Sequence, residues 1–182
     1  RMDQFDILKT IHPLLKLAPE KVALLHEAES VLDWYSRLYI GKEPQRWHLF
    51  LYMLTKSGKH PVVSEVLDRF DLAQRGKTEF MRLREALRQA QIKLPRWQKD
   101  DLSMSGLYAI LSKIPVEGIL ILMALYHDDE LTKHLSHFLT RLHQEQPDIT
   151  GEVLKAIDVP AAPLYGKILA PVLEAQLDGT AA

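Results

Sequence analysis

Apolar residues recur every three or four positions along almost the whole chain, the spacing of an amphipathic α-helix. After Glu79, for example, Phe80, Leu83, Leu87 and Ala90 form one apolar stripe. Strict alternation of apolar and polar residues, which is typical of a half-buried strand, is almost absent. The pattern therefore predicts an all-α chain, an irregular array of about ten helices.

Prolines stand at intervals that suit the starts of helices and the breaks between them. With the apolar period, they predict helices over residues 3–11, 20–40, 45–57, 61–72, 76–93, 103–113, 115–126, 129–145, 151–157 and 163–177. The longest apolar run begins at Ile114, contains Glu117 and stops at His127. It is too short to span a bilayer, so we expect a buried helix there.

Composition places the chain among globular proteins: 47% of its 182 residues are hydrophobic and 26% are charged. The absence of cysteine excludes disulfides and Cys-based zinc sites and fits a reducing compartment, so we expect a cytoplasmic protein. The first residue is Arg1 and no signal-peptide pattern follows it, which suggests an excised fragment.

Charge is unevenly placed. The net charge is −1, but residues 69–99 carry nine Lys or Arg against three acids, a local charge of +6. Lys77, Arg84 and Arg88 share a face of the 76–93 helix that avoids the apolar stripe. We expect this face to bind an anionic partner, with further contributions from Arg82, Arg96 and Lys99; an ordinary solvated face is the alternative.

Motifs for catalysis or metal binding are weak. His127 and Asp128 resemble the paired ligands of a metal hydrolase, but Asp128 is better placed as a helix cap, as is Ser103. Glu130, His134 and His137 share one helical face, which is also what a solvated face would show. We therefore predict no metal site and no catalytic residue in this chain.

Trp97 lies between Arg96 and Lys99. An aromatic side chain flanked by cations can stack on a base while the cations hold phosphates. Large aromatic side chains dominate the burial in domains of this size, so we favour packing in the core or at its boundary.

The C-terminal stretch reads ITGEVL from Ile149, DVPAAPLYGKIL from Asp158 and LDG from Leu177. It resembles the closing motif of the bacterial tRNA nucleotidyltransferase and poly(A) polymerase family: Ile-x-Gly-x-Asp-Leu, Gly-x-x-Pro-Gly-Pro-x-x-Gly-x-x-Leu and Asp/Glu-Gly. The matching residues are Gly151, Leu154, Pro163, Gly166, Leu169, Asp178 and Gly179.

Four positions depart from this motif. Val153 replaces an Asp, Asp158 replaces a Gly, and Ala161 and Ala162 replace a Pro-Gly pair. The spacing of the motif is kept. The order of segments upstream is also similar, so the resemblance covers most of the chain, although its specific part is the C-terminal motif.

The resemblance implies that residues 1–145 form the end of the neck and the body, and that residues 146–182 form tail helices packed on them. In that family a separate head carries the Asp-x-Asp metal pair, so Mg²⁺ is expected for the parent enzyme's head and not here. The body and tail hold the acceptor–TΨC arm of tRNA or tRNA-like RNA while the head adds nucleotides. We therefore expect the 182-residue chain alone to have no nucleotidyltransferase activity.

Two functions are compatible with the sequence. The first is an RNA-binding accessory domain, favoured by the basic segment at residues 69–99. The second is a structural or protein-interaction helical domain of a larger protein, favoured by the near-neutral total charge.

Overall fold

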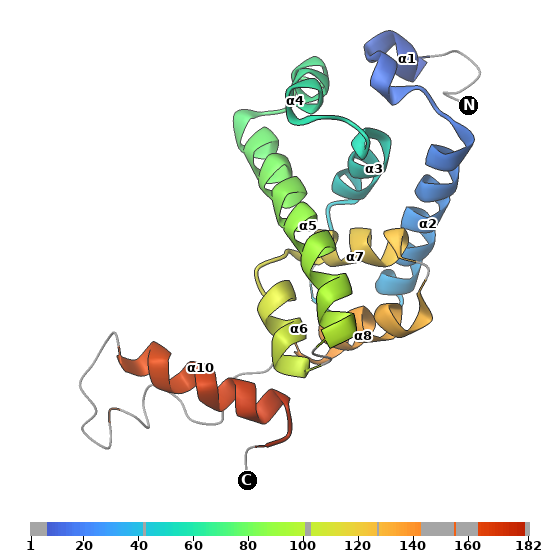
Figure 1. Ribbon diagram of the computed structural model, residues 1–182. Helices are drawn as coiled ribbons and strands as arrows, with labels where there is room; N and C mark the ends of the chain where they lie inside the picture. Colours follow the sequence, from blue (N-terminus) through green and yellow to red (C-terminus); the bar gives the residue numbers. More distant parts are fainter. Residues whose placement is uncertain are drawn as a thin grey trace.

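The computed structural model describes residues 7–41, 43–100, 103–126, 128–142, 155 and 164–180, and every regular element in these ranges is helical (Figure 1). The predicted all-α fold is confirmed. The elements are α1 (Ile7–Ile11), the 3₁₀ helix η2 (Pro13–Leu15), α2 (Pro19–Ser36), α3 (Arg46–Thr55), α4 (His60–Arg69), α5 (Gln74–Asp100), α6 (Met104–Leu111), α7 (Val116–Leu125), α8 (Asp129–Thr140) and α10 (Leu164–Leu177).

Helix α7 lies at the centre of the core. All residues of α7 from Gly118 to Ala124 are buried, so this helix has almost no solvated face. It contacts α2, α3, α5 and α8, and Figure 1 shows it crossing behind α5 to reach α2. Gly118 allows the contact with α5, because a Cβ there would lie 2.9 Å from Leu83 Cδ1 and would also clash with Ile114.

No single helix in the described ranges is long and apolar enough to cross a membrane. Helices α6 and α7 reach that length and composition only as a pair, and the two are bent by 113°. Their apolar side chains belong to the core, where Leu107 and Leu111 of α6 are fully buried.

The apolar stripes predicted from the sequence form the buried faces of the surrounding helices. In α5 the stripe of Phe80, Leu83 and Leu87 is buried, in α8 Leu131, Leu135, Phe138 and Leu139 are buried, and Leu142 just beyond α8 is buried as well. Fully burying a side chain of this size contributes about 1.5–3 kcal/mol. The amphipathic period therefore determines which side of each helix faces the core.

The predicted end of the 76–93 helix before Pro95 is wrong, because α5 continues through this proline to Asp100. Pro95 lacks an N–H group, which normally makes it unfavourable inside a helix. Beyond it the stripe continues with Leu94 and Trp97, both buried, and Trp97 Nε1 donates to the Ser103 carbonyl at 2.8 Å. These contacts offset the cost of the proline, and they confirm that Trp97 packs in the core.

The predicted 20–40 helix is also too long, because α2 ends at Ser36. Tyr39 and Gly41 have φ angles of +53° and +64°, which a helix cannot accommodate. Most of the predicted 151–157 helix lies outside the described residues. The predicted caps are confirmed: Ser103 Oγ accepts from Gly106 N at 3.1 Å, and the Asp128 carboxylate accepts from Leu131 N at 3.0 Å.

The end of α10 is joined to α6. The Asp178 carboxylate accepts from the Ser105 backbone N–H at 2.9 Å and from the Ser105 hydroxyl at 2.6 Å. Leu177 packs against the core, and Gly179 follows with a φ of +67°. Away from this joint, α10 extends outward from the rest of the molecule (Figure 1).

A buried histidine lies in the largely apolar interior. His48 in α3 packs against both Trp47 and Phe80, with ring-centroid distances of 4.0 and 6.0 Å. Both of its ring nitrogens are buried without a hydrogen-bond partner. Burial lowers the pKa of His48 below its ordinary value of 6.5, although the charges of Glu117 and Glu79 oppose this effect. His48 is therefore a destabilising residue, and its protonated form is disfavoured in the folded protein.

Replacing His48 with Leu should raise the free energy of unfolding by about 1 kcal/mol, because it removes two unsatisfied polar atoms from the core. The unfolded chain binds a proton at His48 more readily than the folded protein does. The wild-type stability should therefore fall as the pH drops below about 6.5, and part of this pH dependence should disappear in the variant. Urea unfolding at pH 5.5 and pH 8 measures both effects.

His26, an exposed residue of α2, provides the control. His26→Gln should leave both the stability and its pH dependence nearly unchanged. A His48→Leu protein that is less stable than the wild type at pH 8 would show that His48 makes a favourable polar contact.

Replacing Asp178 with Ala should loosen α10 from α6, because it removes the two hydrogen bonds to Ser105. We expect amide hydrogen exchange in residues 164–180 to accelerate about fivefold, as for the loss of a helix cap worth about 1 kcal/mol. These hydrogen bonds lower the pKa of Asp178 below its ordinary 3.8, so in the wild type the joint should weaken only as the pH falls below that value. Glu174→Ala, at an exposed position of α10, should leave the exchange unchanged; equal rates in the two variants would exclude Asp178 as the joint.

Candidate nucleic-acid interface

A groove rich in basic residues lies between the loop that precedes α4 and the middle of α5. Its volume is about 390 Å³, and we call it the α4–α5 groove. Its cationic side chains are Lys56, Lys59, Arg84 and Arg88, and its acidic side chain is Glu85. The remaining lining residues are Tyr52, Gly58, His60, Met81 and Gln91.

The α3–α4 loop and the first turn of α4 supply one wall of the groove through the sequence KSGKHP, residues 56–61. Lys59 is the N-cap of α4 and its side chain makes no capping hydrogen bond, so the first N–H groups of the helix lack a side-chain acceptor. Gly58 is required because a Cβ there would lie 2.8 Å from Val63 Cγ2. The loop thus brings two lysines together with a helix N-terminus, which favours negative charge.

Arg84 holds this loop in place. One terminal nitrogen, Nη1, donates to the Thr55 carbonyl at 3.2 Å and to its hydroxyl at 3.1 Å, and Nη2 donates to the Gly58 carbonyl at 3.0 Å. The guanidinium also lies 5.4 Å from the centre of the Tyr52 ring. Burial lowers the pKa of Arg84 from its ordinary value. Arg84 is therefore a positioning residue: it holds the end of α3 and the following loop against α5.

Arg88 lies in the same groove and is paired with Glu85 on the preceding turn of α5. The two Arg88–Glu85 hydrogen bonds measure 2.9 and 2.7 Å, and Gln89 donates a further one to Glu85. These hydrogen bonds, with the charge of Arg88, lower the pKa of Glu85 to about 2. Both side chains of the ion pair are more than half exposed, so a stronger anion can compete for Arg88.

The other cations predicted from the sequence do not join this groove. Lys77 Nζ lies 2.7 Å from Asp68 Oδ1 and its side chain is only 23% exposed. Arg82 lines a separate pocket of about 290 Å³ beside Lys113. Arg96 and Lys99 are exposed near the C-terminal end of α5. The structure therefore brings Arg84 and Arg88 together and leaves the other four apart.

Sequence reasoning missed Lys56, Lys59 and His60. The available signal was the run KSGKHP, with three basic side chains in five positions around a glycine and before a helix-starting proline. Of the tail-motif residues, Gly151, Leu154 and Pro163 lie outside the described residues. Gly166 and Leu169 lie in α10, away from the groove.

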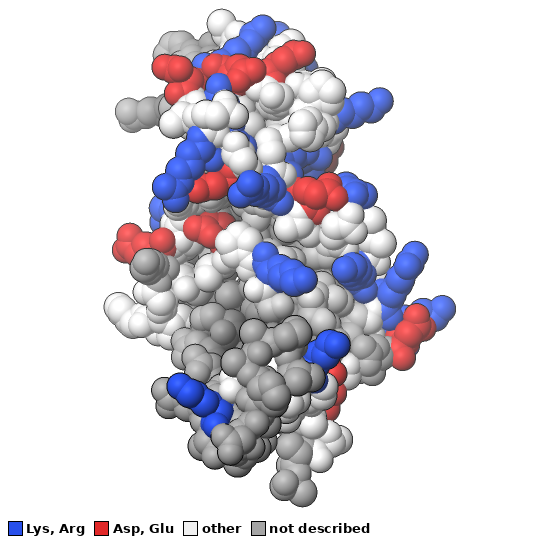
Figure 2. Space-filling view, turned by 90° about the vertical axis from the view of Figure 1, so that its left-hand side faces the viewer, with Lys and Arg blue, Asp and Glu red and all other residues white. Residues whose placement is uncertain are grey.

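The surface charge is mixed. Figure 2, which views the molecule from the left-hand side of Figure 1, shows Lys and Arg side chains interspersed with Asp and Glu over that face. No group of three His, Asp or Glu side chains within the described ranges is arranged to hold a metal ion. Of the three residues of the candidate metal face, His134 packs edge-on against Trp97 at a centroid distance of 5.3 Å.

Comparison with known proteins relates the chain to tRNA nucleotidyltransferases. It is 30% identical over 184 residues to an A-adding tRNA nucleotidyltransferase of Geobacter sulfurreducens. The alignment covers 100% of this chain and 21% of that protein, so the chain spans about a fifth of the length of the curated relative it matches. No family model matches the chain, and no solved structure matches it.

Replacing Arg84 with Gln should lower the free energy of unfolding by about 2 kcal/mol, because it leaves partly buried carbonyl groups without their charged donor. Arg88→Gln is the matched control on the same helix. It removes an exposed ion pair and should change the stability by less than about 0.5 kcal/mol. Urea unfolding of the two variants measures the difference, and equal stabilities would contradict the positioning role of Arg84.

Proposed function

We propose that the chain is the RNA-binding body and tail region of a tRNA nucleotidyltransferase or poly(A) polymerase family protein. It holds the acceptor–TΨC arm of tRNA or tRNA-like RNA while a head elsewhere in the protein adds nucleotides. The observation that carries this proposal is the 30% identity, along the whole chain, with part of an A-adding tRNA nucleotidyltransferase.

The α4–α5 groove supports the proposal on chemical grounds. Lys56 and Lys59 have no carboxylate partner among the described residues, so both ammonium groups can neutralise phosphates. Arg88 can exchange Glu85 for a phosphate, which presents more acceptor oxygens and more charge. These contacts recognise the sugar–phosphate backbone and the shape of an RNA helix, not base identity.

In this proposal four of the six cations predicted from the sequence have different roles, whereas Lys77 is paired with Asp68 and Arg82 lines a separate pocket. Arg84 shapes the groove, and Arg88 contacts a phosphate directly. Arg96 and Lys99, at the far end of α5, extend the same helix as secondary phosphate contacts. The chain has no catalytic residue in this proposal, and Mg²⁺ belongs to the head.

A structural or protein-interaction domain is the second candidate. The interspersed acids and the net charge of −1 favour it, because dedicated RNA-binding domains are usually basic. A second observation is an open groove of about 570 Å³ between α2 and α8. Val31, Trp34 and Met123 supply its apolar part, a composition that suits a protein partner better than a phosphate backbone.

The wild-type chain should bind a tRNA minihelix with a dissociation constant of roughly 1–100 μM near physiological salt. The slope of log affinity against log salt should be about −2 to −4, because each neutralised phosphate contributes roughly 0.7–0.9. Exchanging Lys56 and Lys59 together for Gln should flatten this slope by about 1.5 units. Fluorescence anisotropy at several salt concentrations measures both quantities.

The charge-matched control exchanges Lys16 and Lys133 for Gln, two exposed lysines outside the α4–α5 groove. The control should keep the wild-type slope. If the two double variants lose the same affinity, binding is non-specific attraction to the whole surface. If the wild type does not bind the minihelix even at low salt, the structural candidate replaces RNA binding.

A further inference from the structure

Tyr39 combines full exposure with an unfavourable backbone conformation. Its side chain is 94% exposed, the largest value among the exposed large hydrophobic residues described. Its φ of +53° lies in the left-handed region, which is uncommon for residues other than glycine and costly for a bulky side chain. Neither property helps the chain to fold, and retained local strain is a reason to look for a function.

The turn around Tyr39 is held by specific contacts. Tyr35, a buried residue of α2, donates its hydroxyl hydrogen to the Ile40 carbonyl at 3.0 Å. Gly41 has a φ of +64°, and a Cβ there would lie 3.3 Å from the Tyr35 hydroxyl. These contacts fix the backbone on the C-terminal side of Tyr39, so its ring is presented to solvent by an ordered turn.

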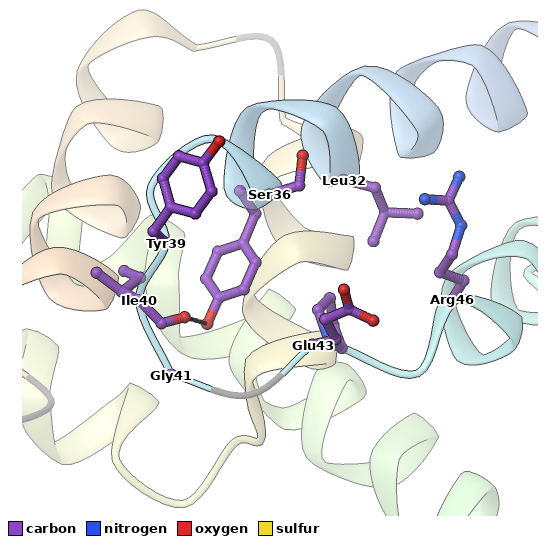
Figure 3. A pocket seen from close by; sticks show the side chains of 9 residues that line it. Leu32, Ser36, Tyr39, Ile40, Gly41, Glu43 and Arg46 are labelled. Carbon is purple, nitrogen blue, oxygen red and sulfur yellow. Dashed lines mark hydrogen bonds between the residues drawn. The ribbon is translucent and has the colours of Figure 1, made fainter.

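A pocket of about 370 Å³ opens beside this ring, between the end of α2 and the start of α3 (Figure 3). Leu32, Tyr35, Ile40 and Pro44 supply its apolar lining. Figure 3 shows Tyr39 and Arg46 on opposite sides of the pocket with Glu43 between them. The Arg46 guanidinium lies 6.0 Å from the centre of the Phe50 ring.

We propose that this pocket binds an unpaired nucleotide of the RNA, with the base stacked on Tyr39, its exocyclic amino group donating to Glu43, and a flanking phosphate on Arg46. The three groups match the three parts of a nucleotide: an aromatic face, an amino donor and an anion. Glu43 accepts hydrogen bonds and cannot donate them, so it favours adenine and cytosine, which carry an amino donor at the position where uracil carries the O4 acceptor.

This inference rests on the proposed RNA-binding function but uses a different surface. The pocket and the α4–α5 groove lie at opposite ends of α3, whose 10 residues span about 15 Å. The groove contacts phosphates of a duplex, whereas the pocket contacts a base that is not paired. The two sites can therefore be tested separately.

The experiment measures the anisotropy of fluorescein-labelled single-stranded RNA hexamers, oligo(A), oligo(C) and oligo(U), and of a blunt RNA duplex without unpaired nucleotides. Tyr39→Asn removes the ring while accepting the left-handed backbone, so its melting temperature should equal or exceed that of the wild type. Its affinity for oligo(A) should fall about tenfold, the loss expected for one stacked base. Its affinity for the duplex should stay unchanged.

Three further variants separate stacking from other effects. Tyr39→Trp keeps an aromatic face and should bind oligo(A) within about twofold of the wild type, whereas Phe70→Asn removes another exposed aromatic side chain and should not alter hexamer binding. Glu43→Ala should abolish the preference for oligo(A) and oligo(C) over oligo(U).

Three outcomes would overturn the inference: hexamer affinity that does not respond to Tyr39→Asn, equal losses for the hexamers and the duplex, or a wild type that does not prefer oligo(A) over oligo(U). If the duplex binds normally in these cases, the proposed RNA-holding function survives without the pocket. If the wild type binds neither the duplex nor the hexamers, both proposals fail.

Discussion

The fold depends on the need to cover α7 on all sides. A helix with apolar residues around its whole circumference must be buried, and here it has to find its partners within one chain. Helices α2, α3, α5 and α8 each bring one apolar face to it. Gly118 sets how close α5 can approach, and the position of α5 in turn determines where Arg84 reaches the end of α3. The shape of the α4–α5 groove therefore depends on how the helices pack around α7.

The sequence predicted those parts of the fold that follow from local pattern. The Phe80–Leu83–Leu87 stripe and the Ser103 and Asp128 caps involve residues a few positions apart, so spacing alone locates them. The helix end predicted before Pro95 was wrong because the contacts that keep this proline inside α5 include the hydrogen bond from Trp97 to Ser103, just before α6. A local rule cannot anticipate a stabilising contact that forms only once the helices pack.

The candidate site was less predictable, because its chemistry depends on contacts between distant positions. The sequence placed Arg84 on a face expected to bind an anionic partner, yet its acceptors in the structure are on Thr55 and Gly58, which lie 29 and 26 residues away. Counting charges along residues 69–99 also gave equal weight to cations with very different surroundings. Lys77 is already paired with Asp68, whereas Lys56, outside that segment, faces the groove. Clustering in space, not density in sequence, decides which cations can act together.

The two hydrogen bonds between Asp178 and Ser105 attach the C-terminal end of α10 to α6. Helix α10 has 14 residues and so is about 21 Å long, and the hydrogen bonds between Asp178 and Ser105 lie just past its C-terminal end. A rotation of about 10° at such a joint would displace the opposite end by about 4 Å, roughly the diameter of a side chain, without changing the packing around α7. A small rotation about the Asp178–Ser105 hydrogen bonds would therefore be amplified along the length of α10.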